Sequence, residues 1–241
     1  MRYGIFADVH GNLEALEAVV TACRNDGARM LFCAGDVVGY GANPKECIAL
    51  LQKFKVVTIA GNHDHAVCGT IGTENFNPVA AAAVDWTKNQ LGQKGIDYLK
   101  ALPLLYRTSE LIMVHATLNE PEKFYYLQDL DQAQDTFYLM DCPVCFIGHT
   151  HSPQVFIREG EKNFLGQGYT IEVRKDGKYI INVGSVGQPR DGHPESSYVL
   201  YDPDLKRIEM KRVAYDVEAA SRKIIEAGLP EILARRLLVG Q

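Results

Sequence analysis

The chain has 241 residues, of which 46% are hydrophobic and 23% charged, a length and composition typical of a folded protein with a sizeable core. Its net charge of −5 and its lack of a long lysine or arginine block count against a long nucleic acid as partner, because such binding neutralises many phosphates. No apolar run approaches the roughly 18 residues of a membrane-spanning helix, and Asp8 comes too early for a signal peptide, so we expect a cytoplasmic protein without membrane contact.

Strand and helix patterns alternate in the first third of the chain. Apolar runs predict strands over residues 3–7, 30–34 and 55–60. Apolar residues at helical spacing predict helices over residues 13–26 and 44–53. Asn12 is placed to cap the first of these helices, and Asn43, Pro44 and Glu46 have the order of a helix start with a capping box. The three strands are apolar almost throughout, which indicates a sheet covered on both faces.

The rest of the chain is first helical and then rich in strands. Helices are predicted over residues 78–91, 95–102, 217–227 and 230–238. Strands are predicted over residues 111–115, 144–147, 154–158, 168–174, 179–183, 198–201 and 207–213. No internal repeat or linker interrupts these elements, so we expect a single domain over residues 1–241.

Polar side chains follow the predicted strands at the points where the strands end. Five of the seven histidines lie in such positions, and two aspartates and an asparagine accompany them. The residues are Asp8, His10, Asp36, Asn62, His63, His115, His149 and His151. Because ligands of open α/β sheets bind at the carboxyl ends of strands, we expect these side chains to converge on one site. Glycines precede Asp36, Asn62 and His149, and we expect them to let the backbone turn sharply there.

The donor set indicates a metal centre. Seven residues carry suitable oxygen or nitrogen donors, namely Asp8, His10, Asp36, Asn62, His115, His149 and His151. Seven donors exceed one tetrahedral site, but two divalent ions sharing a carboxylate would use them all. Such donors suit manganese, iron, zinc, nickel or cobalt. A metal pair can lower the pKa of a bridging water and stabilise both oxygens of a displacement at phosphorus, so the set indicates hydrolysis of a phosphate ester.

The order of these motifs resembles a known signature. The chain contains D-x-H, G-D, G-N-H-D, a lone H and G-H-T-H in this order between Asp8 and His151, as in the calcineurin-like metallophosphoesterase superfamily. The segment 184–190 resembles a later segment of its small bacterial and archaeal members. The resemblance implies an α/β fold, a four-layer α/β/β/α sandwich in which two mixed β-sheets lie face to face and helices flank them.

The resemblance also implies a role for each motif residue. The first metal would be held by Asp8, His10, Asp36 and His151. The second would share Asp36 and be completed by Asn62, His115 and His149. The bridging hydroxide would attack phosphorus, His63 would protonate the leaving oxygen as general acid, and Asp64 would orient His63. A positioned acid near neutral pKa suits an alkoxide leaving group.

Several other residues have two interpretations. Arg190 is a candidate for holding the substrate phosphate through its planar guanidinium, with a surface ion pair as the alternative. Asn12 is a helix cap that is also a candidate for facing the substrate. His65 and His193 either line the cleft or lie in surface loops. The aromatic residues 124–126 either stack on a base or pack in the core, and base rates favour the core.

The leading hypothesis is a phosphoesterase that uses two divalent metal ions, manganese first, on a small phosphodiester or phosphomonoester. The alternative enzyme is a protein or dinucleoside-polyphosphate phosphatase, but those branches typically carry an arginine shortly after G-D, and residues 35–41 contain none. A phosphate-binding regulatory or scaffold protein of the same fold is the non-enzymatic alternative. Neither the natural substrate nor the oligomeric state is encoded in a motif that we recognise.

Overall fold

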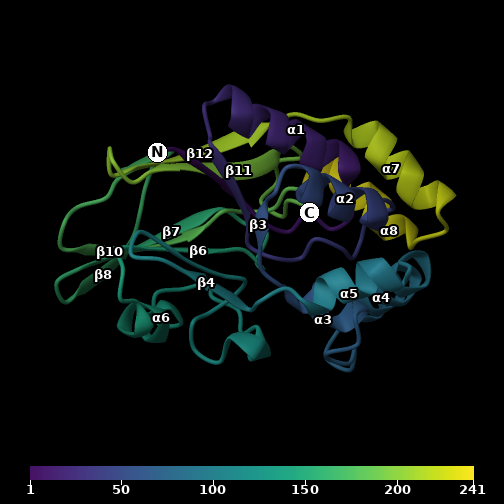
Figure 1. Cartoon of the computed structure of the whole chain (residues 1–241), viewed down its shortest axis with the longest axis horizontal. Coiled ribbons are helices and arrows are strands. Elements are labelled where there is room, and N and C mark those ends of the chain that lie inside the picture. The colour runs from purple at the N-terminus through teal and green to yellow at the C-terminus, as the bar shows by residue number, and fades with distance from the viewer.

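Twelve strands form two six-stranded sheets in the computed structural model, which describes residues 1–241 (Figure 1). The first sheet has the order β3-β2-β1-β11-β12-β9. Its strands are β1 (Tyr3–Phe6), β2 (Met30–Cys33), β3 (Val57–Thr58), β9 (Thr170–Glu172), β11 (Ser196–Asp202) and β12 (Arg207–Val213). The second sheet has the order β4-β5-β6-β10-β7-β8. Its strands are β4 (Leu105–Arg107), β5 (Ile112–Val114), β6 (Val144–Ile147), β7 (Gln154–Glu159), β8 (Lys162–Leu165) and β10 (Gly177–Asn182).

Both sheets mix parallel and antiparallel pairs. In the first, β1, β2 and β3 are parallel, whereas β1 pairs antiparallel with β11 so that Ile5 lies opposite Val199. In the second, β5, β6 and β10 are parallel, and β10 pairs antiparallel with β7. The parallel strands of each sheet are therefore neighbours, which gathers their carboxyl ends.

Helices flank the sheets and complete four layers. The helices are α1 (Leu13–Asn25), α2 (Pro44–Lys53), α3 (Asn62–Val67), α4 (Pro78–Gln90), α5 (Gln93–Lys100), α6 (Ala133–Leu139), α7 (Val217–Glu226) and α8 (Glu231–Val239), with a 3-10 turn η1 (Pro121–Lys123). Helices α1 and α6 lie on opposite outer sides of the two sheets (Figure 1). Apolar side chains of α1 and α2 pack on the first sheet, and those of α6 pack on the second. The four-layer α/β/β/α prediction is confirmed.

The core lies on both faces of the sheets. Ile5 points between the sheets, where it packs in one cluster with Phe32, Phe146 and Val199, whereas its neighbour Phe6 points outward into the cluster of α1. Full burial of such a side chain contributes roughly 1.5–3 kcal/mol. The apolar character of β1 therefore follows from its two covered faces, as predicted. No helix combines the length and the apolar character needed to cross a membrane.

Some elements differ from those predicted. The third strand is shorter, with only Val57 and Thr58 paired to β2, and Lys55 adopts a left-handed φ of 51° that begins it late. Helix α2 starts at Pro44 as expected, but Asn43 makes no side-chain cap bond. The elements α3, α6, β4 and β8 were not predicted. Of these, α3 is largely polar and β8 is largely exposed, so neither shows an apolar pattern.

Candidate active site

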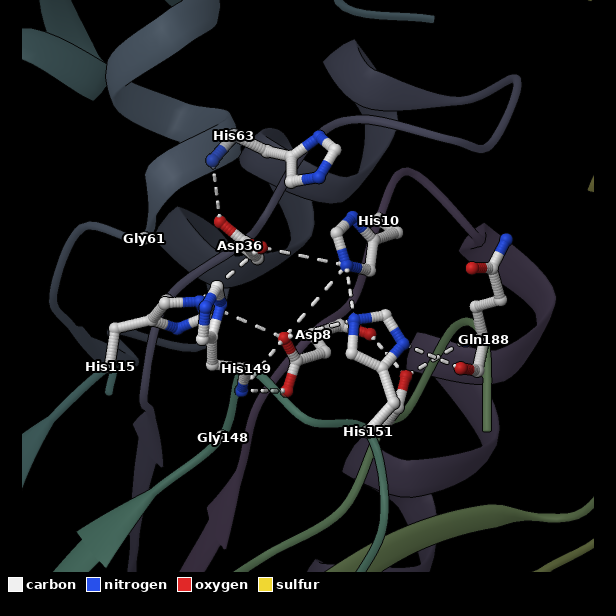
Figure 2. A network of polar contacts seen from close by, with 12 residues as sticks. Asp8, His10, Asp36, Gly61, His63, His115, Gly148, His149, His151 and Gln188 are labelled. Carbon is white, nitrogen blue, oxygen red and sulfur yellow. Dashed lines mark hydrogen bonds and ion pairs between the residues drawn. The ribbon is translucent and has the colours of Figure 1, made fainter. Parts of the chain in front are cut away.

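The predicted site residues converge at one edge of the sandwich (Figure 2). They follow β1, β2, β3, β5 and β6, so both sheets contribute, as expected for side chains at the carboxyl ends of parallel strands. The donor atoms form three groups of three residues each. Within each group the donor atoms lie within 4.8 Å of one another, and all the residues are buried. These groups are Asp8, His10 and His151; His10, Asp36 and His63; and Asp36, His115 and His149.

Backbone amides fix the two carboxylates. The backbone N–H of His149 donates to Asp8 Oδ2 at 3.0 Å, and the backbone N–H of His63 donates to Asp36 Oδ1 at 2.9 Å. The other oxygens face the imidazoles: Asp36 Oδ2 lies 3.6 Å from His10 Nε2 and 3.4 Å from His115 Nε2. Asp36 therefore belongs to two of the three groups of donors, the position expected of a ligand that two ions would share.

Backbone carbonyls orient three of the imidazoles. The Nδ1 atoms of His10, His115 and His151 lie 3.1, 2.7 and 2.6 Å from the carbonyl oxygens of Val38, Ala34 and Gln188. When the Nδ1–H group donates to a carbonyl, the lone pair of Nε2 in the neutral ring is available to a metal. Such a hydrogen bond from the other ring nitrogen is usual for metal-binding histidines. Sequence reasoning missed these partners, since any residue type can supply a carbonyl oxygen.

Several donor atoms lack a hydrogen-bond partner although they are buried. They include Asn62 Oδ1, His115 Nε2 and His149 Nε2, all in the predicted second metal set. In the first set, His10 Nε2 and His151 Nε2 face each other at 3.1 Å, and His151 Nε2 lies 3.4 Å from Asp8 Oδ1. Buried polar atoms are rarely left unpaired, so the unpartnered donors fit a group that accepts lone pairs, namely a cation.

The backbone at the site is strained. Five predicted ligands have left-handed φ values: Asp8 at 55°, His10 at 49°, Asp36 at 53°, His149 at 70° and His151 at 62°. Such conformations cost of order 1–3 kcal/mol each for residues other than glycine, and they cluster at functional sites. In both the D-x-H and the H-x-H motif the two ligands share this conformation, which directs both side chains into the cluster.

The glycines of the motifs act partly by size. Gly35 has a φ of +95°, as predicted for a sharp turn. Gly61 does not, because its φ is −106°, and a β-carbon there would overlap Asp36 Oδ1. A β-carbon on Gly148 would lie 2.5 Å from Asp8 Oδ2. Neither Gly61 nor Gly148 has a left-handed φ, so glycine is needed there because the carboxylates approach closely, and not for the backbone freedom that we predicted.

Burial and mutual charge set the protonation of the site. Burial lowers the pKa of His10 and His151 well below the ordinary value and that of His149 to about 3, so these rings are neutral and able to bind a cation. Burial acts the same way on His115, but the charges of Asp36 and Asp8 overcome it and raise its pKa to about 9. Burial would raise the pKa of Asp36, yet His115 holds it well below its usual range.

His63 belongs to one of the three donor groups, and no hydrogen bond joins its ring to Asp64. The His63 ring packs against His10 and Tyr40, with centroids 4.8 and 4.6 Å away, and its Nδ1 is buried without a partner. The Asp64 carboxylate instead accepts backbone N–H bonds, from Gly61 at 3.0 Å and from Val37 at 2.9 Å. The expected orientation of the ring by Asp64 is therefore wrong, because the first turn of α3 binds this carboxylate.

Arg190 lies at the site without a carboxylate partner. Its guanidinium lies 5.6 Å from the centre of the Tyr40 ring, one of its Nη atoms donates to Gln188 Oε1 at 2.9 Å, and its Nε is buried and unpaired. Its charge is among those that lower the pKa of His10 and His151. The alternative of a surface ion pair is not observed, since the adjacent Asp191 pairs with Arg212 instead.

The structure gives Asn12 a structural role. Its Oδ1 accepts from the Ala15 N–H at 3.1 Å, which confirms the predicted helix cap. Its Nδ2 lies 3.0 Å from the Gly187 carbonyl oxygen and 3.3 Å from the Tyr215 hydroxyl. The Asn12 amide is buried with its polar atoms engaged, so the expected contact with substrate is not supported.

The remaining candidates divide between the interior and the surface. His65 is buried in α3 against the Phe124 ring, whereas His193 is exposed in a loop. Phe124 is buried as expected, but Tyr125 and Tyr126 are 50% and 51% exposed, so the core prediction is wrong for these two. Tyr126 stacks on the ring of the predicted ligand His149, with centroids 4.2 Å apart.

Comparison with known proteins agrees with this geometry. The calcineurin-like phosphoesterase superfamily domain matches residues 1–206. An uncharacterized protein of Methanocaldococcus jannaschii is 40% identical, and the alignment covers 98% of this chain and 97% of that one. The crystal structure of a metallophosphoesterase from Sphaerobacter thermophilus superposes with a TM-score of 0.85 at 37% identity, over 100% of this chain and 99% of that one.

A more distant relative matches only in part. The symmetrical bis(5'-nucleosyl)-tetraphosphatase of Neisseria meningitidis is 28% identical over 120 residues, which are 48% of this chain and 43% of that protein. The family match, in contrast, spans most of the chain and includes every motif from Asp8 to His151. The chain belongs to the calcineurin-like phosphoesterase superfamily.

Proposed function

We propose that this protein is a dinuclear metal-dependent phosphoesterase that hydrolyses a small phosphodiester or phosphomonoester. The observation that carries the proposal is the convergence of six carboxylate and imidazole ligands from both sheets, with Asn62 beside His149 at the adjoining cavity. Asn62 Oδ1, His115 Nε2 and His149 Nε2 are buried and unpartnered. Membership of a phosphoesterase superfamily supports the same chemistry.

The donors would hold two divalent ions with Asp36 shared between them. Asp8, His10 and His151 would complete one ion, and the other would take Asn62, His115 and His149. The mixture of carboxylate, amide and imidazole donors suits manganese, our first choice, as well as iron, zinc, nickel or cobalt. Bound ions of this kind lower the pKa of a coordinated water and neutralise charge on a phosphate.

We assign His63 as the general acid for the leaving oxygen. Burial lowers its pKa to about 4, so the ring is neutral at pH 7 in the free protein. A bound phosphoester brings negative charge to this ring, and a nearby negative charge favours the protonated form. The proton on His63 would then be available for transfer to the departing alkoxide.

We assign Arg190 as the phosphate-binding cation. Tyr40 lies four residues after Asp36, in the segment where other branches of the superfamily carry an arginine, and the Arg190 guanidinium lies over the Tyr40 ring. A guanidinium without a carboxylate partner suits a phosphate, which its planar fork binds well. Arg190 would thus supply from a distant loop the charge that the segment after G-D lacks.

A dinucleoside-polyphosphate phosphatase is the second candidate, favoured by the partial likeness to the Neisseria meningitidis enzyme. A polyphosphate would bring several negative charges to a cluster at which we place a single arginine, Arg190. This comparison of charges favours the simple phosphoester as the first candidate. Relative turnover of a symmetrical dinucleoside tetraphosphate and of simple phosphoesters distinguishes the two candidates.

The test uses metal-stripped protein resupplied with manganese, with bis-p-nitrophenyl phosphate and p-nitrophenyl phosphate as substrates. We expect turnover that requires the metal. The general acid is tested on an alkyl ester such as glycerol phosphate, because its alkoxide needs a proton whereas p-nitrophenolate leaves without one; His63→Ala should lose roughly 10²–10⁴-fold in kcat on the alkyl ester with the metal content retained. His193→Ala is the matched control, since this histidine is exposed in a surface loop. Full activity of His63→Ala on the alkyl ester would contradict the general-acid assignment. Two bound metals without any turnover would favour a phosphate-binding regulator.

A further inference from the structure

A cavity of about 400 Å³ opens beside the predicted second metal set, that is, beside Asn62 and His149. Asn62, His63 and His149 line it on the side of the site. The opposite walls come from the loop before α4 and from the segment after η1, which contribute Phe76 and Tyr126. The volume lies within the range of small-molecule sites. The cavity therefore joins the proposed acid, His63, to a space that can hold an organic group.

Aromatic rings form the walls of this cavity next to the site. Tyr126 lies over His149 at 4.2 Å with an angle of 26° between the ring planes, and Phe76 contacts His63 edge-on at 5.0 Å. Tyr126 is nevertheless 51% exposed, so much of its ring remains available for a further contact. Such a ring stacks favourably on a planar group, and each base stacked on an aromatic side chain contributes about fivefold or more in affinity.

Charge at the cavity disfavours an anion. Its charged lining residues are Glu74, Glu122 and Lys123, so two carboxylates oppose one ammonium group. Arg190 is not part of the lining, and its guanidinium lies over the ring of Tyr40, which borders the cavity. A phosphate would therefore be bound on the side of Arg190, whereas the group in this cavity would be uncharged.

We infer that the cavity receives the leaving alcohol of the ester, and that this alcohol carries a planar, uncharged aromatic group of the size of a nucleobase. The inference rests on the proposed function, because it places the leaving oxygen at His63. In the hydrolysis, water adds its oxygen to phosphorus, the bond from phosphorus to the alcohol oxygen breaks, and His63 gives that oxygen a proton. The proton released by the water returns to His63 through solvent, so the products are the alcohol and the phosphate.

The test compares two substrates that share a leaving oxygen and differ only in the planar group, adenosine 5′-monophosphate and ribose 5-phosphate. The methyl diesters of the same two alcohols form the pair if the enzyme prefers diesters. We expect kcat/KM to be at least about fivefold higher for the adenosine ester, the gain expected from one stacked base. Tyr126→Leu should reduce this ratio towards one, and Tyr126→Phe should keep it. Tyr125→Leu is the matched control, because its ring is 50% exposed and it does not line the cavity.

The outcomes separate this inference from the proposed function. Equal turnover of the two esters, or failure to hydrolyse either while bis-p-nitrophenyl phosphate is cleaved, would overturn the leaving-group assignment and leave the phosphoesterase intact. An equal loss on both esters in Tyr126→Leu would show that the ring only supports His149, and would also overturn it. Absence of all turnover would instead reject the proposed function.

Discussion

Replacing Asp36 by asparagine removes one negative charge from the centre of the site while keeping the shape of the side chain. Asp36 Oδ2 lies 3.4 Å from His115 Nε2, and both residues are buried. Burial lowers the pKa of His115, but Asp36, with Asp8 contributing less, raises it to about 9 from the ordinary 6.5. At about 1.36 kcal/mol per pKa unit, this difference corresponds to roughly 3 kcal/mol in favour of the protonated ring.

We therefore expect the pKa of His115 in metal-free Asp36→Asn protein to fall to roughly 7 or below, since burial then acts against a weaker opposing charge. The assay is a titration of the imidazole Cε1–H signals by nuclear magnetic resonance between about pH 5 and 10. Asp85→Asn is the matched control, because Asp85 is exposed on α4. An unchanged His115 titration in Asp36→Asn would refute the coupling between these two residues.

Three further changes test the fold and the site. Gly61→Ala should lower the free energy of unfolding in urea by more than about 2 kcal/mol, because its β-carbon would overlap Asp36 Oδ1. Gly92 is also at a helix start but has open space around it, so Gly92→Ala should cost about 1 kcal/mol or less. The pKa of His115 is higher in the folded protein than in the unfolded chain, so protonation of this ring stabilises the fold. This contribution is complete below pH 6.5 and disappears as the pH rises through 9, so the free energy of unfolding of the metal-free protein should fall over this interval. Phe137→Ala leaves a cavity where the fully buried Phe137 ring of α6 packs. It should lower the free energy of unfolding by about 3–5 kcal/mol in a denaturant titration, without changing the metal stoichiometry.

Local patterns were sufficient for many elements of the chain. The apolar spacing of α1 and the Asn12 cap predicted that helix, and β6 and β12 were predicted with their observed bounds. The helix α3 was not predicted, since it has six mostly polar residues and owes its position to Asp64, whose carboxylate binds the Gly61 N–H. The pairing of β1 with β11 joins residues almost 200 positions apart, which no local pattern encodes.

The sequence by itself determined the chemistry of the donors and their places after strands, because a strand's carboxyl end and a side chain's donor atoms are properties of short segments. Only the tertiary structure decided which atoms face one another. The carbonyl of Gln188 orients His151, the ring of Tyr126 covers His149, and the carboxylate of Asp64 accepts the N–H of Val37 instead of binding the His63 ring. These contacts join separate segments of the chain through backbone atoms and ring faces, so their geometry arises only in the folded protein.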